Sequence, residues 1–289
     1  MRPYIISTDS MADLSREYME THKVQLHPLH YILDGVEYGA ELETGEMDMK
    51  EFYAAVRNGK KPITNATNVG FDTELFEKAV KEGYDILHLA FASAMSASYN
   101  NACVAAGSVK EKHPEANIIV IDTTEGSGGQ NLLARRAVSN LENGMSIEEN
   151  AADIKNVIPN TQVVFSVPDL MSLYRGGRLK KSAAIIGTVL KVTPILCIDP
   201  KGALAVVNKV RGSKAAQQFL RDTLDPLKEK GTLPDEIAIE HGDCIEAAEE
   251  LAALVKEKYG IEKYHYAYLC PTLGAHTGPG VITFSFIEK

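Results

Sequence analysis

A glycine-rich segment near the C-terminus contains the histidine whose surroundings best suit chemistry. The segment runs from Gly274 to Gly280, holds three glycines around His276, and lies between two expected strands. Glycines at this density let the backbone approach another group closely. The imidazole of His276 could donate a hydrogen bond to a carboxylate or act as a general base. The residues alone leave a purely structural role equally open.

A second candidate is a run of serines that follows an expected parallel strand. Ser93, Ser96 and Ser98 stand at the carboxyl end of that strand, where open α/β sheets place their sites. Their hydroxyl groups, with the N–H groups of the next helix, could hold an anion. The same residues could simply cap the helix, and the sequence does not decide between the two interpretations.

The third candidate is a local basic cluster in an acidic chain. Residues 174–181 read YRGGRLKK, and Lys209 and Arg211 follow later. Two guanidinium groups beside an exposed Gly-Gly backbone favour a docking or anion-binding patch. The alternative is a solvated helix end with basic residues near its negative pole.

Other chemistries have weaker support in the sequence. The glycine-rich turn 126–129 matches neither dinucleotide-binding nor P-loop spacing, so a tight turn is the better interpretation. Ser96 and His276 could pair in a serine-dependent acyl hydrolase, but there is no GxSxG elbow and no identifiable acidic partner. His88 and His241 lack a second ligand at helical spacing, so no metal site is expected.

The composition is that of a globular protein. The chain has 289 residues, of which 45% are hydrophobic and 24% charged, with a net charge of −9, which argues against a general nucleic-acid surface. The first apolar run is too short for a secretory signal, and no apolar stretch approaches the ~20 residues of a membrane span. The cysteines are far apart and form no CxxC pair, which favours a cytoplasmic protein with reduced thiols (Cys103, Cys197, Cys244, Cys270).

The elements that must position these residues divide into two groups. In the first half, strands near 4–7, 85–91 and 117–122 alternate with helices near 14–21, 73–81 and 96–112, which predicts a doubly wound, mainly parallel sheet. A strand over 24–33 and another over 36–38 flank the hairpin signal Asp34-Gly35.

The second half has hairpin-linked strands mixed with helices, which predicts an α+β domain. Expected helices cover 182–191, 214–230 and 245–259, and expected strands include 162–167, 194–198, 203–207, 236–240, 264–269 and 281–286. We place the domains at 1–158 and 159–289, with a ligand buried between or beneath them.

At these segments the chain resembles the DegV family, the bacterial fatty-acid-binding proteins that serve as carrier subunits of fatty acid kinase. The resemblance is nearly full length. It is carried by six motifs in order: 6–10 (ISTDS), 63–68 (ITNATN), 93–99 (SAMSASY), 176–178 (GGR), Arg211, and 275–280 (AHTGPG).

The resemblance implies that a long-chain fatty acid lies in an interior tunnel, with its carboxylate held by Thr64, Ser96 and His276. It implies that Arg178 and Arg211 lie near the kinase-docking surface or contact the product. Residues expected to support the binding loops are Ser93, Ala97, Ser98, Thr277 and Gly278. By the same resemblance the chain is a carrier and not an enzyme. It needs no cofactor or metal, and its partner is the ATP-binding kinase subunit. Transient membrane contact is compatible with this role.

Two motifs depart from the family pattern. Thr64-Asn65-Ala66-Thr67 stands where the family usually has Thr-Ser-Gln-Pro, and residues 95–98 read MSAS in place of Leu-Ser-Gly-Thr. Ala97 thereby adds a β-carbon beside the expected carboxylate. A serine-dependent acyl hydrolase and a binding module for another small ligand remain as alternatives.

Overall fold

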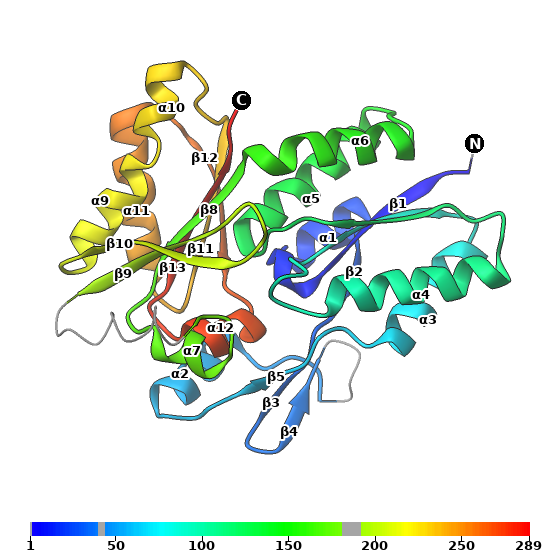
Figure 1. Ribbon diagram of the computed structural model, residues 1–289, viewed down its shortest axis with the longest axis horizontal. Coiled ribbons are helices and arrows are strands. Elements are labelled where there is room, and N and C mark those ends of the chain that lie inside the picture. Colours follow the sequence, from blue (N-terminus) through cyan, green and yellow to red (C-terminus); the bar gives the residue numbers. More distant parts are fainter. Residues whose placement is uncertain (1, 40–43, 181–191) are drawn as a thin grey trace.

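The computed structural model describes residues 2–39, 44–180 and 192–289, and is built around two sheets (Figure 1). The first sheet is four-stranded and parallel, in the order β2-β1-β6-β7. Its strands are β1 (Tyr4–Asp9), β2 (Gln25–His27), β6 (Asp85–Ala90) and β7 (Ile118–Asp122). All six residues of β6 are buried, as expected for an inner strand covered on both faces.

Helices cover both faces of the parallel sheet, which confirms the doubly wound prediction. Helices α3 (Val69–Lys81) and α4 (Ser98–Lys112) pack on one face through a cluster that includes Phe76 and Val109. Helices α5 (Ser127–Glu142) and α6 (Ile147–Val157) pack on the other through Leu133 and Ile154.

The second sheet has six strands in the order β10-β9-β8-β13-β11-β12 and is antiparallel except between β11 and β12. The strands are β8 (Thr161–Ser166), β9 (Thr193–Ile198), β10 (Leu204–Val210), β11 (Glu236–His241), β12 (Lys263–Tyr268) and β13 (Ile282–Ile287). One face packs against α9 (Ser213–Asp222), α10 (Asp225–Lys230) and α11 (Ile245–Tyr259). The other face turns toward the first half of the chain, where α5 packs against β11 and β13 (Figure 1).

A third, small sheet of β3 (Tyr31–Leu33), β4 (Val36–Tyr38) and β5 (Ile63–Thr64) lies beside α2 (Met49–Arg57), α7 (Met171–Arg175) and α12 (Pro271–Thr277) (Figure 1). Asp34 and Gly35 have φ of 53° and 82°, so the predicted hairpin turn is confirmed. The remaining short elements are η1 (Ser10–Ala12), α1 (Arg16–His22) and η2 (Ile158–Asn160).

Two predictions of local structure were wrong, and one helix was not predicted. The single strand expected over 24–33 is two strands, β2 and β3, which join different sheets on either side of Pro28. The helix expected over 214–230 is broken before Pro226, whose ring cannot continue a helix. The segment before Gly278, for which only a place between two strands was expected, is the helix α12, with Pro271 in its first turn.

The helix expected over 182–191 lies outside the described residues. Within the described part of the chain, no helix is long and apolar enough to cross a membrane.

Candidate functional site

A cavity lies between the inner face of the six-stranded sheet and the first half of the chain. It holds about 700 Å³ of space between protein atoms, counting the solvent at its open mouth. Most of its wall is apolar. The apolar lining comes from both halves of the chain: Met11, Leu29, Phe91, Met95, Val163, Phe165, Leu173, Ile198, Leu204, Leu269 and Leu273.

Two polar side chains meet in the cavity wall from distant parts of the sequence. Thr64 comes from β5 and His276 from α12, and Thr64 Oγ1 lies 2.9 Å from His276 Nε2. Burial, together with the nearby Arg178 charge, lowers the pKa of His276 to about 4. The imidazole is therefore neutral at pH 7. If Nε2 carries the proton, the ring donates a hydrogen bond to Thr64 Oγ1. The Thr64 hydroxyl can then donate its own hydrogen bond into the cavity.

The Gly176-Gly177-Arg178 turn is built around this histidine. A β-carbon on Gly176 would lie 2.7 Å from His276 Cε1 and closer still to Nδ1, so only glycine fits against the ring. Gly177 has φ +75° and open space around it, so it is glycine for its backbone conformation. Arg178 then reaches across the turn and donates from Nε to the Met95 carbonyl at 3.1 Å.

Ser96 lines the cavity and is held by Ser98, the first residue of α4. The Ser98 N–H donates to Ser96 Oγ at 3.2 Å, and the two hydroxyl oxygens are 2.9 Å apart. Ser96 Oγ therefore accepts the N–H of the first helical residue and also lines the cavity, while the N-cap residue itself is Ala97, which makes no side-chain capping bond.

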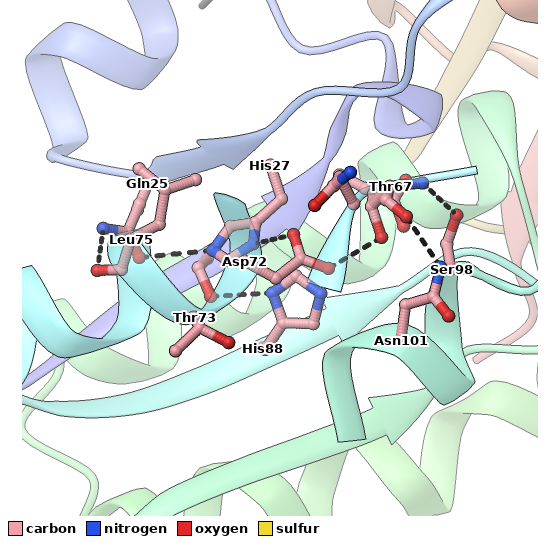
Figure 2. A network of polar contacts seen from close by, with 12 residues as sticks. Gln25, His27, Thr67, Asp72, Thr73, Leu75, His88, Ser98 and Asn101 are labelled. Carbon is pink, nitrogen blue, oxygen red and sulfur yellow. Dashed lines mark hydrogen bonds and ion pairs between the residues drawn. The ribbon is translucent and has the colours of Figure 1, made fainter. Parts of the chain in front are cut away.

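Behind Ser98 lies a buried network that the sequence did not predict (Figure 2). The Thr67 N–H donates to Ser98 Oγ at 3.3 Å, and Thr67 Oγ1 donates to Asp72 Oδ2 at 2.7 Å. Asp72 Oδ1 is 2.8 Å from His27 Nδ1. Asn101 adds a hydrogen bond to the Thr67 carbonyl at 2.6 Å. These residues are spread from β2 to α4, so no local spacing connects them.

A groove outside the cavity shares part of its wall. Thr64, Arg178, His276 and Thr277 line both spaces. The groove also contains four further basic residues: Arg57, Lys60, Lys61 and Arg175. A charged species in the groove would therefore lie next to the Thr64–His276 pair.

The structure brings most of the predicted site residues together. Thr64, Ser96, Arg178, His276 and Thr277 line the cavity, and Gly278 lines the groove. The other predicted residues lie beside these spaces or away from them. Ala97 immediately precedes α4. Ser93 is exposed, is not among the described residues that line the cavity, and donates its backbone N–H to Asp122. Arg211 is exposed after β10 and is not among the described residues that line either space.

The geometry does not support nucleotide binding or hydrolysis by a serine nucleophile. A β-carbon on Gly128 would lie 2.6 Å from Glu240 Oε2, so the glycine turn serves close packing and the start of α5 faces the protein's own carboxyl group. His276 Nε2 is hydrogen-bonded to Thr64 and not to Ser96, so the expected nucleophile–base pair is not formed. No group of three or more His, Cys, Asp or Glu side chains in the described ranges could hold a metal ion.

Comparison with known proteins places the chain. The family model described as "Uncharacterised protein, DegV family" matches residues 4–289. The chain belongs to the DegV family. A DegV domain-containing protein of Clostridium perfringens is 34% identical over 289 residues, covering 99% of this chain and 98% of the relative.

Solved DegV-family structures have the same fold. A stearic acid-binding protein from Eubacterium ventriosum has a TM-score of 0.88 at 26% identity, covering 99% of this chain and 98% of the other. A DegV family protein from Thermus thermophilus, described by its fatty acid binding, has a TM-score of 0.86 at 26% identity over 100% of both chains.

Proposed function

We propose that this DegV-family chain binds a long-chain fatty acid in the cavity and presents its carboxylate to a partner kinase. The observation that carries the proposal is an apolar cavity with the Thr64–His276 pair and Ser96 in its wall. The related proteins from E. ventriosum and T. thermophilus, which are described as binding stearic acid or fatty acid, support it.

Binding energy and headgroup recognition come from different parts of the cavity. Burying a C16 tail contributes on the order of 11 kcal/mol gross, from about 14 methylenes at ~0.8 kcal/mol each, and lost ligand freedom offsets much of it. A carboxylate cannot be buried without donors. The hydroxyls of Thr64 and Ser96 supply them, and the neutral ring of His276 orients the Thr64 hydroxyl through its hydrogen bond.

The kinase step needs no cofactor in this chain. A carboxylate oxygen would attack the terminal phosphorus of ATP held by the partner, the bond from that phosphorus to ADP would break, and ADP would leave. The basic groove beside Thr64 and His276 suits the approach of that phosphate, and Arg178 lies where cavity and groove meet. ATP and Mg²⁺ belong to the partner in this scheme.

A cytoplasmic location fits the proposal, since all four cysteines are free and stay reduced there. Fatty acids partition into bilayers, so loading would involve transient membrane contact.

Native mass spectrometry of the purified chain, followed by denaturing extraction, tests ligand binding. A fatty acid at near one per chain is the expected result and would name the preferred tail. A chain that carries no fatty acid and takes none up would refute the proposal.

The kinase step is tested by adding ATP, Mg²⁺ and an ATP-binding kinase subunit to the loaded chain. Hydroxylamine would trap the acyl phosphate as a hydroxamate. Hydroxamate is expected only when both proteins are present. A loaded chain that supports no hydroxamate with such a subunit would leave lipid binding in place and remove the kinase role.

A further inference from the structure

The hydrogen bonds that lead through Thr67 to Ser98 (Figure 2) have a direction that follows from their donors. A backbone N–H can only donate, so Thr67 N–H fixes Ser98 Oγ as an acceptor. Ser98 is 1% exposed, and a buried hydroxyl proton needs an acceptor of its own. The only acceptor recorded within reach in the described part of the chain is Ser96 Oγ at 2.9 Å.

Ser96 Oγ therefore accepts twice, once from the Ser98 hydroxyl and once from the Ser98 N–H at 3.2 Å. Both of its lone pairs are used. Its own proton has no partner within this chain of bonds, and Ser96 lines the cavity. The arrangement makes Ser96 a donor toward the ligand, not an acceptor from it.

The buried pair behind Thr67 keeps this direction fixed. Asp72 is 1% exposed and His27 is fully buried, and each oxygen of Asp72 has its own partner, Thr67 Oγ1 at 2.7 Å and His27 Nδ1 at 2.8 Å. The His27 ring packs against His88, with ring centroids 4.6 Å apart. A threonine tied at its side chain to a buried carboxyl group cannot easily turn its N–H away from Ser98.

We propose that Thr67 and Ser98 are positioning residues that hold the Ser96 hydroxyl as a donor into the cavity and so make the site prefer an ionised carboxylate over a neutral headgroup on the same tail. This inference rests on the proposed fatty-acid binding and adds its headgroup selectivity. A hydrogen bond to a charged acceptor is stronger than one to a neutral acceptor. The fixed donor therefore favours the acid more than the alcohol.

The test compares hexadecanoate with hexadecan-1-ol on delipidated protein by displacement of a fluorescent fatty acid. In Ser98→Ala the preference for the acid over the alcohol should fall roughly tenfold, the size of one hydrogen bond to a charged group. Ser98→Thr keeps the hydroxyl and should restore the preference. Ser108→Ala is the matched control, because Ser108 is partly exposed on the same helix and the hydrogen bond recorded for its hydroxyl in the described part of the chain goes to the Val104 carbonyl.

A double-mutant cycle separates positioning from general damage. If Ser98 acts through Ser96, then Ser96→Ala and the double variant Ser96→Ala/Ser98→Ala should have the same acid-to-alcohol ratio. The carboxyl pKa of bound [1-¹³C]hexadecanoate, followed by NMR, should rise by about one unit in Ser98→Ala, since a lost donor to the charged form raises a pKa.

An equal loss of acid and alcohol binding in Ser98→Ala, or additive ratios in the cycle, would overturn the positioning role. If Ser98→Ala does not fold, Thr67→Val replaces it. It keeps the N–H and the branched shape but loses the bond to Asp72, and should shift the same ratio in the same direction by a smaller factor. Wild-type protein that binds neither ligand would instead overturn the proposed function, and this inference with it.

Discussion

The adjacent glycines of the Gly176-Gly177 turn should respond in opposite ways to alanine substitution. Gly176 has φ −72°, a conformation that alanine adopts readily, but its β-carbon would lie 2.7 Å from His276 Cε1. An ordinary carbon–carbon contact is about 3.5 Å, so the ring must retreat by at least about 0.8 Å, and further to clear Nδ1, which lies closer still. That movement would displace Nε2 from its position 2.9 Å from Thr64 Oγ1 and so distort the Thr64–His276 hydrogen bond.

We therefore expect Gly176→Ala to weaken fatty-acid binding roughly tenfold while changing stability little, because the lost contact involves the charged headgroup. Gly177→Ala should do the reverse. It meets no atom within 4 Å, but its φ of +75° costs an alanine about 1–2 kcal/mol in the folded state.

Displacement of a fluorescent fatty acid measures the first effect and thermal unfolding the second. The crossed pattern is what identifies His276 as the group that Gly176 accommodates. Wild-type affinity in Gly176→Ala, or a greater loss of affinity in Gly177→Ala, would refute the reasoning.

Three further predictions concern His276, Arg178 and the buried carboxyl group of Glu240. His276→Ala should reduce hydroxamate formation with the kinase subunit more than it reduces copurified fatty acid, since the tail carries most of the binding energy; unchanged hydroxamate would contradict the headgroup assignment. Arg178→Ala should retain the lipid and lose turnover with the kinase, and loss of lipid on extraction would show that the arginine acts inside the cavity. Glu240→Gln should flatten the dependence of stability on pH. Burial raises the pKa of Glu240 from 4.5 to about 7, so the native state binds more protons than the unfolded state between these values and stability falls as pH rises. From pH 6 to pH 8 this group should lower the free energy of unfolding by about 1 kcal/mol. If thermal melts of the variant show the same dependence of stability on pH as the wild type, Glu240 does not contribute to that dependence.

The architecture was largely predictable because its signals are local. Strand β7 is a nearly continuous apolar run and β6 is mostly apolar, and the hairpin at Asp34-Gly35 needs only two residues with positive φ. The family motifs likewise led to Thr64, Ser96 and His276 before their proximity was known. The helix α12 was missed because the glycines around His276 indicate close backbone approach rather than a helix. A β-carbon on Gly274 would lie 2.7 Å from Tyr53 Oη, so glycine is needed here for a tertiary contact that the sequence does not show.

The network behind Ser96 was invisible for a related reason. His27, Thr67 and Asp72 lie on three different segments, and each is an ordinary residue where it stands. Thr67 was noted only as a departure from the family's usual proline. In the structure the Thr67 N–H donates a hydrogen bond to Ser98 Oγ, and a proline at this position could not form that bond because it has no N–H.

Two separate chains of hydrogen bonds thus end at the cavity, one through His276 and Thr64 and the other through Ser98 and Ser96. Both end in a hydroxyl, and neither includes a cation, since the pKa of His276 is lowered to about 4 and the ring is neutral. An arginine paired with the carboxylate would hold it more tightly but would also stabilise its charge and weaken it as a nucleophile. Hydroxyl donors satisfy a buried carboxylate while leaving one oxygen free to react. The nearest guanidinium group, that of Arg178, lies where the cavity meets the basic groove, and there it can attract an incoming phosphate. This separation of neutral donors from cationic residues is what a carrier that hands over a reactive carboxylate requires.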